Sequence, residues 1–294
     1  MSSITKLIGN TPLVKLDRIP TNPNVTIYGK LEGNNPGGSV KDRAAFGMIS
    51  GALDRGDIKS GDHLVEATSG NTGIALAMIA QLMGLKMTLV MPDTATKERV
   101  LTMKAYGAKV KLTPGDKSIT HSREVAEEMG STDDYHMLNQ FANLDNPAMH
   151  YRTTGPEVYR DTDGKLTHFV SAMGTTGTIM GVSKFLKEQN ADIQIIGAQP
   201  EDGSRIPGIR RWPKEFLPKI YDSSRVDRII DVSQTEATDM ARRLAKEEGI
   251  LAGMSSGGSC AAALRMSEEL ESGIIVFIVC DRGDRYLSSP LYNI

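Results

Sequence analysis

The sequence predicts an α/β protein of two three-layer domains with mostly parallel sheets. Short apolar runs alternate with longer stretches of helical period along the chain, which is typical of parallel sheets covered by helices. A length of 294 residues suits two domains, because a domain has roughly 150 residues. We find no solenoid repeat, heptad run or low-complexity tract that would favour another class.

Six apolar runs have the length and flanking residues of strands. They are His63–Ala67, Lys86–Met91, Ala108–Leu112, His168–Ala172, Ile193–Gln199 and Ile274–Cys280.

Seven stretches have the period of amphipathic helices. They are Val40–Leu53, Ile74–Met83, Lys97–Tyr106, Ile119–Met129, Thr178–Lys187, Thr235–Glu248 and Cys260–Leu270. Gly107, Gly130 and Gly249 follow the last periodic residue of three of them, so we expect left-handed caps there.

Composition excludes several classes of function. The formal net charge of −2 disfavours nucleic acid or an anionic membrane as a partner. Two cysteines are too few for a disulfide scaffold, and the five histidines never lie within five residues of one another, so we expect no metal site. The N-terminus lacks the apolar region of a signal peptide, and the longest apolar run is too short to span a bilayer, so we expect a cytoplasmic protein.

Three Gly/Ser/Thr-rich loops are each expected between a strand and a helix, at Glu66–Gly73, Ser171–Thr178 and Gly253–Gly258. In a parallel sheet such loops lie at the carboxyl ends of the strands, where helix N-termini present free N–H groups to anions. One such loop alone is equally well explained as a tight turn with an N-cap. The presence of three such loops favours an anion-binding site.

The loop Gly174–Thr178 has the composition of a phosphate site. Its glycines allow close approach of the backbone, and Thr175, Thr176 and Thr178 add neutral donors. It is neither a Walker A loop nor G-x-G-x-x-G, and it brings no lysine. We therefore expect the phosphate of a held cofactor rather than a transferred phosphoryl group.

Lys41 lies where a helix is expected to begin, with Ser39 as its N-cap. The helix dipole and Arg43 both disfavour positive charge at this end, so the amine is more often neutral and a better nucleophile toward an aldehyde. The alternative is a solvated surface lysine. Pyridoxal phosphate needs both an amine of this kind and a phosphate site.

The loop Thr68–Gly73 offers hydroxyls, an amide and backbone N–H groups suited to a substrate carboxylate. Gly253–Gly257 also matches the G-x-S-x-G motif of serine hydrolases. In α/β-hydrolases the catalytic histidine follows the serine, and no histidine follows His168. The hydrolase hypothesis is therefore disfavoured.

Together these motifs resemble the fold-type II pyridoxal-phosphate enzymes (tryptophan synthase β-like fold), and within them the cysteine synthases, or O-acetylserine sulfhydrylases. The matching segments run nearly the whole chain in order. They are Ile8–Leu13, Lys30–Glu32, Asn35–Arg43, Glu66–Gly73, Gln140–Pro147, His150–Glu157, Gly174–Thr178 and Ser255–Gly257. Ile206–Trp212 and Cys280–Leu287 resemble the B-type branch.

The resemblance implies a role for each matching residue. Lys41 would form the Schiff base with pyridoxal 5'-phosphate, Asn71 would contact the ring oxygen, and Ser255 would meet the pyridine nitrogen. Gly174, Thr175, Thr176, Gly177 and Thr178 would hold the phosphate. Thr68, Ser69, Thr72 and Gln140 would hold the substrate's α-carboxylate.

The implied activity is a β-replacement that makes L-cysteine from O-acetyl-L-serine and sulfide through an aminoacrylate, in a homodimer. Arg210 and Arg211 are expected to favour larger anionic donors such as thiosulfate, which would give S-sulfocysteine. Two alternatives stay open: a sister enzyme that uses O-phosphoserine or serine, and a non-catalytic homologue that serves as a binding partner.

The implied domains are a smaller, mobile substrate-binding domain at residues 36–146 and a larger cofactor-binding domain at residues 1–35 and 147–294.

Overall fold

The computed structural model describes residues 4–68 and 70–293. They form two compact units, a smaller one of residues 4–8 and 41–146 and a larger one of residues 9–40 and 147–293. The sequence places residues 1–35 in the larger domain, whereas Ile8 packs into the apolar core of the smaller unit. The first residues therefore group with the smaller unit because of a long-range apolar contact.

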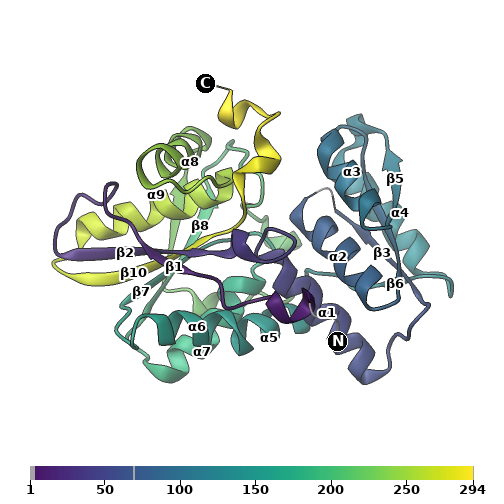
Figure 1. The fold of residues 1–294 in the computed structure, drawn as a ribbon, viewed down its shortest axis with the longest axis horizontal. Coiled ribbons are helices and arrows are strands. Elements are labelled where there is room, and N and C mark those ends of the chain that lie inside the picture. The colour runs from purple at the N-terminus through teal and green to yellow at the C-terminus, as the bar shows by residue number, and fades with distance from the viewer. Residues whose placement is uncertain (1–3, 69, 294) are drawn as a thin grey trace. The chain divides into compact units, whose positions relative to one another are not determined.

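The smaller unit is built on a four-stranded, all-parallel sheet with the order β5-β4-β3-β6. The helices α1, α2 and α3 pack on one face and α4 on the other (Figure 1). The elements are α1 Lys41–Arg55, β3 His63–Ala67, α2 Asn71–Leu82, β4 Lys86–Pro92, α3 Lys97–Ala105, β5 Lys109–Thr113, α4 Ser118–Gly130 and β6 His136–Met137.

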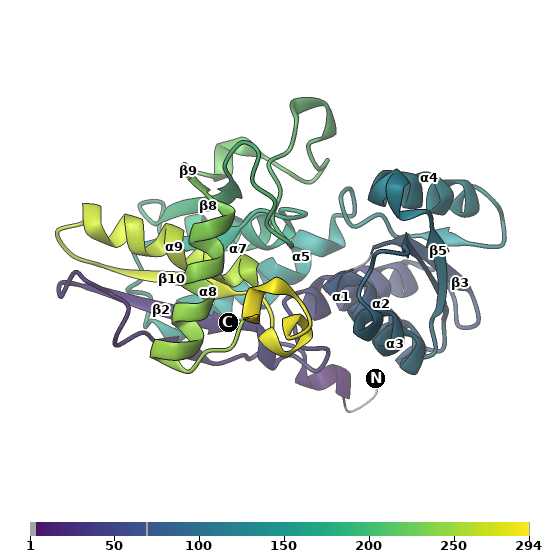
Figure 2. The same cartoon turned by 90° about the horizontal axis from the view of Figure 1, so that it is seen from above.

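The larger unit has a six-stranded sheet with the order β1-β2-β10-β7-β8-β9, in which only β1 is antiparallel to its neighbour. Helices α8 and α9 cover one face, and α6 and α7 cover the other (Figures 1 and 2). The elements are β1 Leu13–Lys15, β2 Val25–Leu31, α5 Asp145–Arg152, α6 Thr154–Asp161, β7 His168–Ala172, α7 Gly177–Gln189, β8 Gln194–Pro200, β9 Arg228–Val232, α8 Gln234–Glu248, α9 Met254–Glu269 and β10 Gly273–Val279.

The strand β10 shows why the apolar runs predicted strands. Ile275 and Phe277 pack with α8 and α9, while Val276 and Ile278 pack with α6 and α7. A parallel strand buried on both faces is apolar throughout rather than alternating. All six predicted strands are present with bounds within one residue, and the predicted fold class is confirmed.

The start of α9 corrects one prediction. The segment Gly253–Gly258 was expected as a loop after a strand, but α9 begins at Met254 and the preceding helix is α8. The third of the glycine-rich segments therefore forms the first turns of a helix.

Two of the three predicted glycine caps are confirmed, since Gly107 and Gly249 have φ of 85° and 71°. Gly130 instead lies in the last turn of α4. Among the described residues, no helix is long and apolar enough to cross a membrane.

Candidate active site

The predicted phosphate loop connects β7 to α7 in the larger unit. Thr176 has φ of 70° and precedes α7, and its side chain does not cap the helix. The loop itself satisfies the first N–H of the helix, since the N–H of Gly177 donates to Thr175 Oγ1 at 3.3 Å. The side chains of Thr175, Thr176 and Thr178 are all buried. The hydroxyl of Thr176 has no hydrogen-bond partner within residues 4–68 and 70–293. A buried hydroxyl without a partner is costly unless a ligand satisfies it.

Glycine is required at the start of this loop by a close backbone contact. A Cβ on Gly174 would lie 2.7 Å from the carbonyl oxygen of Gly208. The indole Nε1 of Trp212 donates to the carbonyl oxygen of Gly174 at 2.8 Å. The backbone N–H of Arg210 donates to the carbonyl oxygen of Met173 at 2.9 Å. The segment after β8 thus packs directly on the phosphate loop.

Ser255 lies in the first turn of α9 and is buried beside the same segment. A Cβ on Gly208, which has φ of 93°, would approach the Cβ and Oγ of Ser255 to 3.2 Å. The structure therefore brings Ser255, the phosphate loop and residues 206–212 together, although they are far apart in the sequence.

His150 is a residue of this region to which the sequence analysis gave no role. It is 1% exposed, and its ring nitrogens lie 2.9 Å from Thr154 Oγ1 and 3.3 Å from Thr178 Oγ1. The imidazole thus orients a hydroxyl of the phosphate loop. Only the folded structure shows this contact, because His150 and Thr178 are 28 positions apart in the sequence.

The end of β10 anchors two site segments. The N–H of Cys280 donates to Ser256 Oγ of α9 at 2.9 Å, and the carbonyl oxygen of Cys280 accepts from the N–H of Val40 at 2.8 Å. Lys41 follows directly as the first residue of α1, as predicted, and is half-buried. Ser39, expected as the N-cap, lies two residues before the helix, and its backbone pairs with that of Asp281.

The smaller unit holds the residues expected for the substrate carboxylate. Asn71 is the first residue of α2, and Thr68, Thr72 and Gln140 are buried. Thr72 Oγ1 donates to Gln140 Oε1 at 2.9 Å, which joins residues 68 positions apart. Ser69 lies outside the described residues. The neutral hydroxyl and amide groups of this cluster suit a carboxylate.

The two arginines differ in their surroundings. Arg211 Nε donates to the carbonyl oxygen of Pro200 at 2.9 Å, and the guanidinium forms ion pairs with Asp202 and Asp231. The guanidinium of Arg210 lies 5.5 Å from the ring centroid of Trp212. Arg211 thus holds the backbone of Pro200 and two carboxylates, while Arg210 lies beside the indole of Trp212.

A family model described as pyridoxal-phosphate dependent enzyme matches residues 4–281. The chain belongs to this family. It is 58% identical over 291 residues to the cysteine synthase B of Pseudomonas aeruginosa, covering 99% of this chain and 97% of that protein. It is 53% identical over 293 residues to the cysteine synthase B of Escherichia coli, covering 100% of this chain and 97% of that protein. The crystal structure of a cysteine synthase from Entamoeba histolytica matches with a TM-score of 0.95 and 40% identity, covering 100% of this chain and 91% of that chain.

These matches confirm the predicted fold-type II class and the predicted resemblance to B-type cysteine synthases. The cofactor of this family member is pyridoxal 5'-phosphate. The larger unit fits it: a phosphate would satisfy the buried hydroxyl of Thr176, at the N-terminus of a helix that the Thr176 side chain does not cap. A hydroxyl, that of Ser255, is available for a pyridine nitrogen.

Proposed function

We propose that the protein makes L-cysteine from O-acetyl-L-serine and sulfide by a pyridoxal-phosphate-dependent β-replacement. The observation that carries this proposal is the full-length identity of 58% to a cysteine synthase B, in a chain that keeps every residue expected for that chemistry. The phosphate loop, Lys41 and the Thr72–Gln140 pair support it independently, because they would supply a phosphate site, an amine for the cofactor aldehyde and a carboxylate site.

Each group has a defined task. Residues 174–178 would hold the cofactor phosphate through neutral donors, Ser255 would face the ring nitrogen, and Asn71 would contact the ring oxygen. When bound, the cofactor stabilises negative charge at the α-carbon of an attached amino acid. A serine hydroxyl does not enforce a protonated ring, which favours prompt loss of a β-substituent.

Lys41 carries the proton chemistry. Its amine would bind the cofactor aldehyde between turnovers, remove the proton from the substrate Cα, and return that proton at the end. The Cβ–O bond breaks with its electron pair leaving on acetate, and the sulfur of HS⁻ donates the pair that forms the S–Cβ bond. Thr68, Ser69, Thr72 and Gln140 would hold the substrate carboxylate meanwhile. Two half-reactions of this kind predict ping-pong kinetics.

The choice of sulfur donor is the finer part of the proposal. We propose that Arg210 and Arg211 widen it to thiosulfate, Arg210 by direct attraction and Arg211 by fixing the segment through Pro200 and Asp231. The same positive charge leaves O-phosphoserine as an alternative amino-acid substrate.

Three further expectations belong to the proposal: a homodimer, a cytoplasmic location, and a mobile substrate-binding role for residues 36–146. Size-exclusion chromatography with light scattering tests the first directly. Cell fractionation tests the second, and hydrogen exchange with and without substrate tests the third.

The deciding experiment measures cysteine formation by the purified holoenzyme from O-acetylserine and sulfide, with O-phosphoserine and thiosulfate in parallel arms. Lys41→Ala should lower turnover by at least about a thousandfold, because one residue serves as anchor, base and acid. Lys59→Ala, an exposed lysine outside the site, is the matched control. A Lys41→Ala enzyme with wild-type turnover, or a wild type that makes no cysteine from O-acetylserine, would overturn the proposal.

A further inference from the structure

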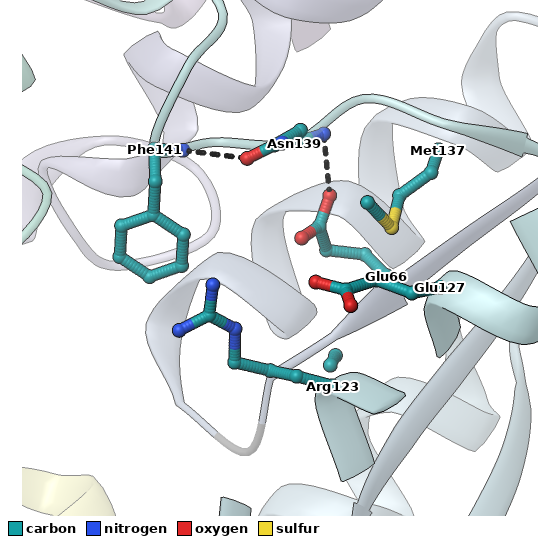
Figure 3. A pocket seen from close by; sticks show the side chains of 7 residues that line it. Glu66, Arg123, Glu127, Met137, Asn139 and Phe141 are labelled. Carbon is teal, nitrogen blue, oxygen red and sulfur yellow. Dashed lines mark hydrogen bonds between the residues drawn. The ribbon is translucent and has the colours of Figure 1, made fainter. Parts of the chain in front are cut away.

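A buried carboxyl group that the proposed chemistry does not use lies at the end of β3. Glu66 is 4% exposed, and its Oε2 accepts a hydrogen bond from the backbone N–H of Asn139 at 3.1 Å. Figure 3 shows the carboxyl group directed at this N–H from the strand below the turn. Glu66 therefore joins β3 to the turn that follows β6.

This turn aims the predicted carboxylate ligand Gln140. Asn139 has φ of 54°, an uncommon conformation for a residue other than glycine. The Oδ1 of Asn139 accepts a hydrogen bond from the N–H of Phe141 at 3.3 Å. The carbonyl oxygen of Asn139 accepts a second one from the N–H of Asn143 at 3.0 Å. The hydrogen bond that the N–H of Asn139 donates to Glu66 thus fixes the residue immediately before Gln140.

The backbone pairing of the two strands stops just before this point. The last pair between β3 and β6 is Val65 with Met137. Glu66 extends the connection by one side-chain hydrogen bond, and Gln140 then accepts from Thr72 Oγ1 at 2.9 Å. The position of Gln140 against Thr72 therefore depends on the Glu66 contact.

A cavity of about 10 Å³ lies beside this carboxyl group, room for about one water molecule. Besides Glu66, the ionisable groups that line the cavity are Arg123 and Glu127, both on α4. The guanidinium of Arg123 lies 5.2 Å from the ring centroid of Phe141 (Figure 3). Burial, mainly, raises the pKa of Glu66 to about 7, with Glu127 acting in the same direction and the Asn139 hydrogen bond and Arg123 opposing it.

We propose that Glu66 is a positioning residue of the substrate-carboxylate site, which it builds by holding the Asn139 turn so that Gln140 meets Thr72. This inference rests on the proposed function, because the ligand of Gln140 is the carboxylate of the amino-acid substrate. An ionised carboxylate accepts a stronger hydrogen bond than a neutral carboxyl group. The site therefore holds the substrate more tightly as pH rises through about 7, while Arg123 balances the charge of Glu66.

The test compares Glu66→Leu, which removes the acceptor, with Glu66→Gln, which keeps an acceptor but does not ionise. Glu127→Gln is the control, because it lies on the same cavity but is exposed. The holoenzymes are assayed for the KM of O-acetylserine and for kcat between pH 6 and pH 8. Cofactor content and the affinity for glycine, followed by the cofactor spectrum, are measured in parallel.

We expect Glu66→Leu to raise the KM about tenfold, with kcat within about twofold and full cofactor content, since one charge-assisted hydrogen bond is lost. At pH 6 the KM of Glu66→Gln should lie much closer to the wild-type KM than the KM of Glu66→Leu does. The ratio of the Glu66→Gln KM to the wild-type KM should rise about fivefold between pH 6 and pH 8. The Glu127→Gln ratio should change far less, because Glu127 has the smallest influence on the pKa of Glu66. Taking ratios removes the titration of the substrate itself.

A folded Glu66→Leu enzyme with unchanged KM, or a pH-independent ratio for Glu66→Gln, would overturn the positioning role. If Glu66→Leu does not fold, the pH dependence of the Glu66→Gln KM relative to the wild-type KM still tests the positioning role. Failure of the proposed function looks different, because the wild type would then make no cysteine, while the glycine affinities of the variants would still report on the carboxylate site.

Discussion

The phosphate loop of the larger unit and the carboxylate site of the smaller unit both bind anions in our proposal, but they are built differently. The phosphate loop is enforced by steric contact, since Gly174 has no space for a side chain against Gly208. Gly70, in the carboxylate loop, has nothing within 4 Å of an added Cβ. The carboxylate site depends instead on hydrogen bonds, among them one that a titratable buried carboxyl group, that of Glu66, accepts.

The difference matches the ligands. A cofactor phosphate stays bound through many turnovers, and close backbone packing around neutral donors suits such a ligand. A substrate carboxylate must enter and leave in each turnover, so a site held by a few hydrogen bonds is sufficient. Steric packing and hydrogen bonds to a buried carboxyl group are thus divided between two units of one chain.

The largest effect that tests this comparison is expected from Gly174→Ala. The new Cβ would lie 2.7 Å from the Gly208 carbonyl oxygen, so the loop must shift and cofactor affinity should fall by about a hundredfold. Titration of the apoenzyme with pyridoxal phosphate, followed by the fluorescence of the single tryptophan, measures it. Gly70→Ala should leave cofactor affinity within about twofold; equal losses in both variants would contradict the steric difference.

Thr176→Val should weaken cofactor binding by about thirtyfold, because the buried hydroxyl has no partner among the residues that the structure describes and a hydrogen bond to a charged group contributes about 2 kcal/mol. The melting temperature of the apoenzyme should stay nearly constant or rise. Thr96→Val is a matched control in the smaller unit, since its hydroxyl is likewise buried without a partner in the described chain. A cofactor effect in both variants would show that the loss is not specific to the loop.

Thr72→Val in the smaller unit should raise the KM for O-acetylserine about tenfold and leave cofactor affinity unchanged, because it breaks the 2.9 Å bond to Gln140 and removes a donor. Steady-state kinetics together with the apoenzyme titration separate the two quantities. A loss of cofactor affinity as large as the rise in KM would show that the two sites are not independent.

The smallest effect concerns stability and pH. Burial raises the pKa of Glu66 from its ordinary 4.5 to about 7, so its contribution to stability is full below pH 4.5 and is lost as pH rises through about 7. The wild type should lose about 1 kcal/mol of unfolding free energy from this group between pH 6 and pH 8. Denaturant unfolding of Glu66→Gln should show a flatter pH dependence; an identical slope in both proteins would contradict the raised pKa.

The sequence predicted the parallel architecture well because most of its strands, β10 among them, are largely buried and form continuous apolar runs, although β5 is mostly exposed. The sequence analysis did not predict β2, which has a neighbour on each side in the sheet, because Gly29 and Lys30 interrupt the apolar run. Lys30 is fully buried and lies 3.0 Å from both Glu157 and Asp161. A charged residue in a strand core is explained only by partners that come from a distant helix.

The helix α9 was predicted to begin six residues late, since Ser255–Gly258 has the composition of a turn. Close packing accounts for the small residues: a Cβ on Gly257 would lie 2.0 Å from the carbonyl oxygen of Ala237 in α8. Local propensity therefore gave way to a helix–helix contact that the sequence does not display.

The sequence alone determined the fold class, the family and the residue types at each anion site, because periodicity and motif spacing are local properties. Only the tertiary structure decided which residues support them: His150 contacts Thr178, Glu66 accepts a hydrogen bond from Asn139, and Asp231 forms an ion pair with Arg211. These contacts join segments separated by 20 to 73 residues. Hydrogen bonding and burial act through space, so their partners follow from the packing of the sheets and helices.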